Sequence, residues 1–201
     1  MRVIAGWAKG TRLAAFKGAD IRPTLDRVKE SFFNKVGPQL EGETFLDLFA
    51  GSGSMGIEAL SRGAEKVVFV ENNHRAQNLI YSNLERCHFG RDGVESHEKN
   101  WVLLKYDAIH ALHLLEERGY RFDIVYVDPP FADEIYTDCL LALSHSHLLT
   151  ESSLVVVEHY HKQVLEKKYD KLVFQMERRM GDSCLSYYEL ASEKAVESVN
   201  G

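Results

Sequence analysis

The spacing of hydrophobic positions changes near residue 44. From there to about residue 160, short apolar runs alternate with segments whose apolar residues recur every three or four positions. The short runs predict strands and the periodic segments predict helices. Strands that are apolar on both faces and separated by helices indicate a parallel sheet covered on both sides, so the sequence predicts an α/β fold.

Five strands and four helices are expected in this region. The strands are FLDLF at 45–49, VVFVE at 67–71, WVLLKY at 101–106, FDIVYVD at 122–128 and SLVVVEH at 153–159. The helices span 55–62, 74–86, 108–117 and 133–145, and the polar segment 88–100 is expected to be a loop. Two later runs, KLVFQMERR and SCLSYYEL, flank a Gly-containing turn and predict a hairpin. The sheet is therefore expected to have seven strands, mostly parallel, with an antiparallel last strand.

The first residues follow a different pattern. RVIAGW and TRLAAF, within residues 2–16, predict a small β-hairpin. The Arg22-Pro23 pair is expected to be extended, and a helix is expected from Leu25 to the Gly37-Pro38 stop. The predicted units are a basic N-terminal appendage (1–38), a main α/β domain (39–190) and a polar, frayed tail (191–201).

Charge is distributed unevenly along the chain. The net charge is −6, with 24 Lys+Arg and 30 Asp+Glu. Residues 1–35 contain eight Lys/Arg and three Asp/Glu, a net charge of +5, so the remaining 166 residues carry −11. A basic segment on an acidic body indicates an anionic partner such as a phosphate backbone, and an ordinary solvated surface is the alternative. The candidate contacts with such a partner are Arg2, Lys9, Arg12 and Arg22.

Other composition features exclude several classes of protein. The chain has no run of 18 apolar residues, and its first ten residues lack the apolar stretch of a secretory signal, so we expect neither membrane insertion nor export. Its three cysteines are widely spaced and odd in number, which is typical of reduced thiols in the cytoplasm. No CxxC or HExxH motif accompanies the nine histidines, so no metal site and no cysteine nucleophile are expected.

A glycine-rich turn, Asp47 to Gly56, follows the first apolar strand and contains GxGxxG. Such glycines let the backbone approach a nucleotide-like ligand at a helix N-terminus. Glu71 ends the next strand, twenty residues after Gly51, where a carboxylate accepts hydrogen bonds from ribose hydroxyls. This arrangement predicts a cofactor that contains adenosine.

Two cofactors, a dinucleotide and S-adenosylmethionine, fit this turn. Asp47 would face the ligand, where an acid suits the ammonium and cationic sulfur of S-adenosylmethionine and repels a pyrophosphate. A structural bond from Asp47 to a backbone amide is the alternative. Asp107 is placed to bind the adenine amino group, and its alternative role is a helix N-cap. The predicted cofactor-binding residues are Asp47, Phe49, Ala50, Gly51, Ser52, Gly53, Glu71 and Asp107.

A second turn, Asp128-Pro129-Pro130-Phe131, ends the strand at 122–128. In a doubly wound sheet this strand lies beside the one ending at Phe49, at the point where ligands bind. The Asp128 carboxylate and the Pro129 carbonyl would accept the two N–H groups of a planar exocyclic amine, and Phe131 offers a face for the base. We therefore predict Asp128, Pro129, Pro130 and Phe131 as the catalytic residues, with a purely structural turn as the alternative.

With these motifs, the chain resembles the bacterial family of 16S rRNA (guanine-N2)-methyltransferases of the RsmD type. The resemblance covers residues 2–190 and rests on RPTLDRVKE at 22–30 with Phe33-Asn34, DLFAGSGSMGIEALSRGA at 47–64, VDPPF at 127–131 and YYE at 187–189. The first segment is specific to the family, whereas the glycine turn and DPPF occur in many methyltransferases. Two segments depart from the family pattern: the polar connection at 88–100 and the C-terminal residues 193–201.

The resemblance implies a Rossmann-like, class I S-adenosylmethionine-dependent methyltransferase fold. It implies S-adenosylmethionine as the methyl donor and one guanine of 16S rRNA, presented in the small ribosomal subunit or its assembly intermediate, as the acceptor. Adenine-N6 and glutamine-N5 methyltransferases share a similar turn, but a DNA enzyme normally needs an added recognition domain, so no DNA partner is expected. Two alternatives belong to other classes. One is a small NAD-dependent oxidoreductase, whose expected Tyr-x-x-x-Lys motif or second domain is absent from this sequence. The other is a non-catalytic RNA-binding protein, and the intact turn at Asp128 argues against it.

Overall fold

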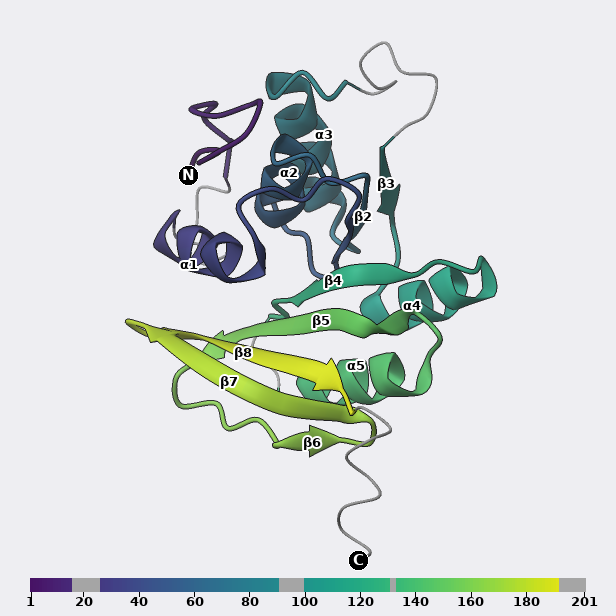
Figure 1. Ribbon diagram of the computed structural model, residues 1–201. Helices are drawn as coiled ribbons and strands as arrows, with labels where there is room; N and C mark the ends of the chain where they lie inside the picture. Colours follow the sequence, from purple (N-terminus) through teal and green to yellow (C-terminus); the bar gives the residue numbers. More distant parts are fainter. Residues whose placement is uncertain (16–25, 91–99, 131–132, 192–201) are drawn as a thin grey trace, which may run out of the picture.

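The computed structural model describes residues 1–15, 26–90, 100–130 and 133–191 (Figure 1). Its centre is an eight-stranded sheet in the order β3-β2-β1-β4-β5-β8-β7-β6. The strands are β1 (Thr44–Asp47), β2 (Lys66–Val70), β3 (Trp101–Leu104), β4 (Phe122–Val127), β5 (Leu149–Tyr160), β6 (Lys168–Tyr169), β7 (Leu172–Met180) and β8 (Ser183–Leu190). The helices are α1 (Asp26–Val36), α2 (Ser54–Ser61), α3 (His74–Arg86), α4 (Ala108–Glu117) and α5 (Asp133–His145).

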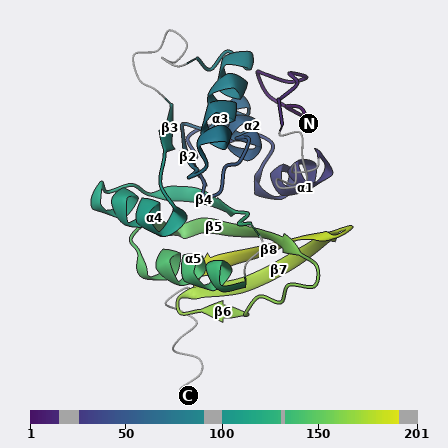
Figure 2. The same ribbon diagram turned by 180° about the vertical axis from the view of Figure 1, so that it is seen from behind.

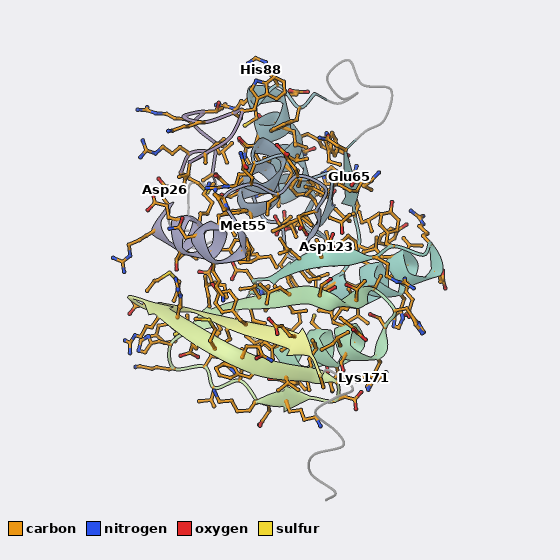
Figure 3. All side chains as sticks on the ribbon, in the orientation of Figure 1. Asp26, Met55, Glu65, His88, Asp123 and Lys171 are labelled. Atoms are coloured by element: carbon orange, nitrogen blue, oxygen red, sulfur yellow. The ribbon has the colours of Figure 1, made fainter. Side chains whose placement is uncertain are left out.

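Helices cover both faces of the sheet, as the doubly apolar strands predict. Successive residues of a strand point to opposite faces, and Phe45 and Leu46 accordingly belong to two different apolar clusters. One cluster packs the sheet against α1, α2 and α3, and the other packs it against α4 and α5. Figure 2 shows α4 and α5 in front of the sheet, and Figure 3 shows side chains filling the space between helices and strands.

The parallel part of the sheet confirms the predicted topology. Strands β1 to β5 pair in parallel, and β1 lies between β2 and β4. The chain therefore reverses its direction of winding at β1, and the crevice at this switch point opens beyond the carboxyl ends of β1 and β4. The bounds of α3, α4 and α5 agree with those expected from the sequence.

The C-terminal part of the sheet differs from the prediction by one strand. Strands β7 and β8 form the expected hairpin, and β8 lies antiparallel between β5 and β7. The expected count of seven strands is wrong because β6 adds an eighth strand at the edge, antiparallel to β7. Since β6 has two residues, it is too short to produce an alternating pattern in the sequence.

The predicted N-terminal hairpin is wrong in its extent. Residues 1–15, the N-terminal segment, contain one isolated antiparallel bridge, Arg2 to Arg12, and no strand. Four of its backbone N–H groups donate to side chains of α2 and α3: Ile4 and Ala5 to Glu58, Ala8 to Ser61 and Ala14 to Asn83. The segment thus docks on two helices, while the N–H groups of Val3 and Leu13 still donate to the carbonyls of Thr11 and Met1 across the predicted hairpin.

The helix after this segment ends where the sequence predicts, at Val36, immediately before Gly37-Pro38. Its expected start at Leu25 lies outside the described residues, as do Arg22, the loop residues 91–99 and residues 192–201 of the tail. In the described ranges, no helix has the length and apolar character needed to cross a membrane.

Candidate active site

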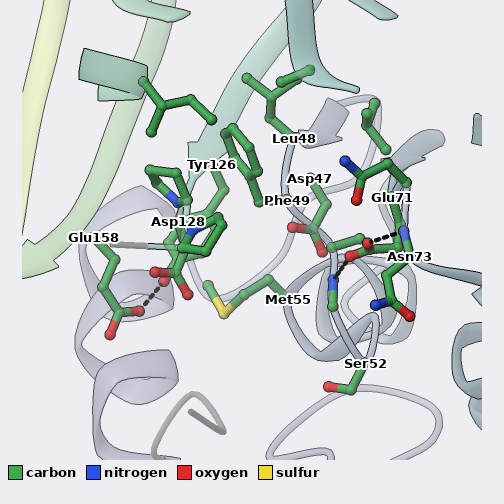
Figure 4. A pocket seen from close by; sticks show the side chains of 18 of the residues that line it. Asp47, Leu48, Phe49, Ser52, Met55, Glu71, Asn73, Tyr126, Asp128 and Glu158 are labelled. Atoms are coloured by element: carbon green, nitrogen blue, oxygen red, sulfur yellow. Dashed lines mark hydrogen bonds between the residues drawn. The ribbon is translucent and has the colours of Figure 1, made fainter. Parts of the chain in front are cut away.

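A cavity of about 450 Å³ opens at the carboxyl ends of the parallel strands (Figure 4). Its wall combines the glycine turn after β1, the end of β2, the start of α4, the turn after β4 and the end of β5. The predicted residues that line it are Asp47, Phe49, Ala50, Gly51, Ser52, Glu71, Asp107, Asp128, Pro129 and Pro130. Gly53 shapes the turn without appearing in the wall, and Phe131 lies outside the described residues. The structure therefore brings most of the predicted residues into one site.

Two glycines give the turn its shape. Gly53 is the N-cap of α2 with φ of 76°, a left-handed conformation that side chains disfavour. A Cβ at Gly56 would lie 2.2 Å from the Phe69 ring of β2, so only glycine lets α2 pack this closely on the sheet. These two constraints explain the second and third glycines of GxGxxG and place the α2 N-terminus at the cavity.

Asp47 ends β1 and is 2% exposed. Its Oδ2 accepts a hydrogen bond of 2.9 Å from the Gly56 N–H, so Asp47 has the structural role that the sequence offered as an alternative to ligand binding. Asp47 also lines the cavity. The pKa of Asp47 is raised to about 7, chiefly by burial and in smaller part by the charge of Glu71, while the hydrogen bond from the Gly56 N–H opposes the shift. A cationic ligand group beside Asp47 would favour the ionised form.

Glu71 connects the ends of β1 and β2. Its Oε2 accepts from the Gly51 N–H at 2.8 Å and its Oε1 accepts from the Asn73 N–H at 2.7 Å. Burial raises the pKa of Glu71, and these backbone donors oppose the shift. Each oxygen of a carboxylate has a second lone pair, so these bonds leave acceptor capacity for two hydroxyl groups of a ligand.

Asp107 is the N-cap of α4, which is the role that the sequence offered as an alternative to adenine binding. Its side chain accepts from the His110 N–H at 2.9 Å, and it also lines the cavity. The neighbouring Tyr106 ring is stacked on His110, with ring centroids 4.6 Å apart and an interplanar angle of 4°. This end of the cavity therefore combines an acid with an aromatic side chain that is 43% exposed.

The turn after β4 lies beside two residues that sequence reasoning missed. The Tyr126 hydroxyl, on β4, donates a hydrogen bond to Oε2 of Glu158, on β5, and both residues line the cavity with Asp128 (Figure 4). Burial raises the pKa of Tyr126 well above its ordinary value, and the negative charges of Glu158 and Asp128 add to this shift. The signal for Glu158 was present in the sequence, since it is the acid near the end of the run SLVVVEH.

The cavity is rich in carboxyl groups. Five carboxyl groups line it, and the described lining residues include neither Lys nor Arg: the acids are Asp47, Glu71, Asp107, Asp128 and Glu158. Ser54, the first residue of α2, also lines the cavity, and its buried hydroxyl has no hydrogen-bond partner among the described residues. A buried polar atom normally has a partner, so this hydroxyl is available to a ligand. The donor set suits a ligand with positive charges and polar groups, and it opposes a pyrophosphate.

The N-terminal segment is fixed to α2 by a buried charge cluster that sequence reasoning missed. Glu58 is fully buried and accepts from the N–H groups of Ile4 and Ala5 at 2.8 and 3.0 Å. The same carboxylate pairs with Lys29 Nζ at 3.3 Å and Arg62 Nε at 2.9 Å. Lys29 also donates to the Arg2 carbonyl at 2.6 Å, so helix α1 takes part in this docking.

Of the predicted RNA contacts, Arg2, Lys9 and Arg12 are exposed on the N-terminal segment. The Arg2 guanidinium lies 3.8 Å from Asp26, and the other predicted contact, Arg22, lies outside the described residues. Ala15, at the end of the segment, lines the cavity. The exposed cations are thus carried by a segment that reaches the rim of the site.

Three side chains on the C-terminal strands, His159, Glu177 and Cys184, have potential ligand atoms within 4.8 Å of one another. Two of them, His159 and Glu177, are already linked through Ser186: His159 Nε2 lies 2.9 Å from its hydroxyl, which donates to Glu177 at 3.2 Å. Burial raises the pKa of the Cys184 thiol and lowers that of His159. These shifts do not favour a thiolate ligand, and the absence of a metal stays a prediction.

Comparison with known proteins identifies the family. Residues 1–189 match the family described as "Conserved hypothetical protein 95". The chain belongs to this family. The Bacillus subtilis protein named "Putative rRNA methyltransferase YlbH" is 36% identical over 189 residues, which cover 94% of this chain and 98% of that protein. "Ribosomal RNA small subunit methyltransferase D" of Haemophilus influenzae is 34% identical, with 79% of this chain and 78% of that protein covered.

A solved structure agrees with this membership. The structure described as "Putative methyltransferase yhhF from Escherichia coli" is 28% identical, covers 96% of this chain and 99% of that chain, and has a TM-score of 0.79. The predicted Rossmann-like methyltransferase fold and the predicted resemblance to the RsmD-type rRNA methyltransferases are therefore confirmed.

Proposed function

We propose that this protein transfers a methyl group from S-adenosylmethionine to the exocyclic N2 amine of a guanine in 16S rRNA of the small ribosomal subunit. The observation that carries the proposal is the anionic cavity, in which five carboxyl groups and the Asp128-Pro129-Pro130 turn share one wall. A dinucleotide would bring its pyrophosphate into this negative field, so NAD chemistry is disfavoured. The name of the Haemophilus influenzae relative supports the choice of small-subunit rRNA.

The cavity residues fit S-adenosylmethionine in three regions. We assign Asp47 and Ser54 to its amino-acid end, where the acid meets the ammonium group and the hydroxyl gains a partner. Glu71 would accept from the ribose hydroxyls and Asp107 from the adenine amine. When bound, this cofactor supplies a methyl group on a cationic sulfur, which makes the methyl carbon electrophilic.

Asp128 and Pro129 would prepare the acceptor amine. The nitrogen lone pair of an aromatic amine is delocalised into the ring, so the amine is a weak nucleophile. A carboxylate at Asp128 and the Pro129 carbonyl accept its two N–H groups, hold the nitrogen in line with the methyl group and favour a tetrahedral nitrogen. When the N–C bond forms and the S–C bond breaks, the nitrogen releases one proton, which Asp128 or water accepts.

The proposal predicts a specific product in a methyl-transfer assay. Small subunits from a strain that lacks this protein are incubated with the purified protein and S-adenosylmethionine carrying a tritium-labelled methyl group. We expect label in 16S rRNA, recovered as N2-methylguanosine after digestion to nucleosides. Subunits from a strain that contains the protein serve as the control, since their target is already methylated. Label recovered as N6-methyladenosine, or in protein, would contradict the guanine assignment.

The exposed cations of the N-terminal segment predict a second result. Because the rest of the chain is acidic, we propose that rRNA is held through Arg2, Lys9, Arg12 and Arg22. Phosphate contacts provide affinity and make it dependent on salt. The double variant Lys9→Ala/Arg12→Ala should raise the KM for small subunits by about tenfold and reduce the slope of log affinity against log salt by about one to two. Affinity for S-adenosylmethionine should not change.

A matched control removes two cations elsewhere. Lys168 and Lys171 are exposed near β6, and Figure 3 shows Lys171 far from the N-terminal segment. The variant Lys168→Ala/Lys171→Ala has the same net charge as the test variant and should keep the wild-type KM and salt slope. If both double variants behave alike, the effect is one of overall charge and the segment does not hold RNA.

A further inference from the structure

Glu158 is a buried acid that the proposed chemistry does not use. It is 7% exposed and lines the cavity near the end of β5. Strands β4 and β5 pair in parallel through Val127 and Val157. The next residues along the two strands are Asp128 and Glu158, so their side chains lie on the same face of the sheet. Figure 4 shows both carboxyl groups at the same end of the cavity.

Tyr126 holds Glu158 in this position. The Tyr126 hydroxyl donates a hydrogen bond to Oε2 of Glu158, and the raised pKa of Tyr126 keeps it a proton donor. A carboxylate has two oxygens with about four acceptor positions, and Glu158 lines the cavity, so it can accept a hydrogen bond from a donor that a ligand brings. Two carboxyl groups on one wall of a cavity favour a ligand that brings positive charge or hydrogen-bond donors. The site is therefore suited to a ligand that brings several N–H groups.

Guanine brings such a row of donors. Its Watson–Crick edge carries the N2 amine and, on the adjacent ring atom, the N1–H donor, whereas N1 of adenine is an acceptor. Neighbouring strands lie about 4.8 Å apart, so acceptors on β4 and β5 can meet adjacent groups of one base. If Asp128 and Pro129 accept from the N2 amine, the acid on the next strand lies beside N1.

We propose that Glu158 accepts the N1–H of the target base and thereby selects guanine over adenine, an inference that rests on the proposed function. Glu158 acts as a recognition residue with an oriented carboxylate, and Tyr126 is its positioning residue. An adenine in the same place would bring the lone pair of N1 against this carboxylate. Specificity arises because a site built around a hydrogen bond rejects a base that lacks the donor.

The test uses the base analogue 2,6-diaminopurine, which keeps the 2-amino group and has an N1 acceptor like adenine. Small subunits are reconstituted with RNA that carries either guanosine or 2,6-diaminopurine riboside at the methylated position. We expect the wild-type protein to prefer guanosine by about 100-fold or more in kcat/KM. In Glu158→Gln, the amide oxygen still accepts from Tyr126. The amide nitrogen is a donor, so it cannot accept the N1–H of guanine. The rate on guanosine should fall by about 10- to 100-fold, and the preference should shrink to within about tenfold.

Two other variants separate recognition from structure. Glu189→Gln removes an exposed acid of β8 that does not line the cavity, and it should keep the wild-type rate and preference. Tyr126→Phe removes the phenol but keeps the Glu158 carboxylate, so it should lose rate and still prefer guanosine. A structural role for Glu158 predicts instead that Tyr126→Phe and Glu158→Gln behave alike.

Each result decides the inference. If Glu158→Gln keeps the wild-type ratio of guanosine to 2,6-diaminopurine, Glu158 does not recognise the base, although the proposed function stands. If the wild-type protein transfers no methyl group to guanosine, the proposed function fails, and the inference fails with it. Should Glu158→Gln not fold, as judged by thermal unfolding, Glu158→Asp keeps the charge with a shorter reach. It should lose rate but retain the preference for guanosine, and loss of that preference would overturn the inference.

Discussion

Replacing Asp128 with alanine is expected to lower methyl transfer to small subunits by about 10²- to 10⁴-fold. The proposed carboxylate acts on the acceptor amine, so its loss removes the acceptor that orients the nitrogen and receives its proton. Asp128 lines the cavity beside Glu158 and follows a strand whose partners remain in place. Affinity for S-adenosylhomocysteine, measured by calorimetry, should therefore stay within about twofold of wild type.

The variant Asp128→Asn provides the matched comparison. Its amide oxygen still accepts one N–H, so this variant should retain more activity than Asp128→Ala while lacking the negative charge. Asp138→Ala, at an exposed position of α5, should have wild-type activity. If Asp128→Ala lost cofactor affinity and turnover together, Asp128 would be a structural residue, and the proposed chemistry would be wrong.

Replacing Glu58 with alanine is expected to lower the free energy of unfolding by about 3–5 kcal/mol. The substitution would leave the fully buried ammonium of Lys29 and the nearly buried guanidinium of Arg62 without their common partner. It would also remove the acceptor for the N–H groups of Ile4 and Ala5. Burial lowers the pKa of Lys29, and the charge of Glu58 opposes this shift. The Lys29 side chain therefore depends on the Glu58 carboxylate to remain a charged ammonium. Urea unfolding measures the change.

An exposed acid near the same helix gives the control for this experiment. Glu65, between α2 and β2, is exposed, and Glu65→Ala should change the free energy of unfolding by about 0.5 kcal/mol or less. The N-terminal segment should also become more susceptible to proteases in Glu58→Ala than in Glu65→Ala. A loss of about 1 kcal/mol or less in Glu58→Ala would mean that the cluster relaxes around the missing side chain and that other contacts hold the segment.

The sequence by itself determined the features that depend on local patterns. The alternation of strands and helices predicted a parallel sheet with helices on both faces, because hydrophobic period reflects which faces each element buries. The turn from Asp47 to Gly56 predicted the cavity wall, because positive φ at Gly53 and the close packing of Gly56 on Phe69 require glycine. The prolines after Asp128 similarly end a strand at a defined place.

Only the tertiary structure decided the features that join residues distant in the chain. The expected N-terminal hairpin is reduced to one bridge with a few backbone bonds, and side chains more than 50 residues away, including Glu58, accept other backbone N–H groups of the segment. Glu158 reaches Tyr126, 32 residues earlier, only because β4 and β5 pair in register. Residue type and spacing report the local preferences of the backbone, whereas the partner of a buried charge is fixed by how the elements pack.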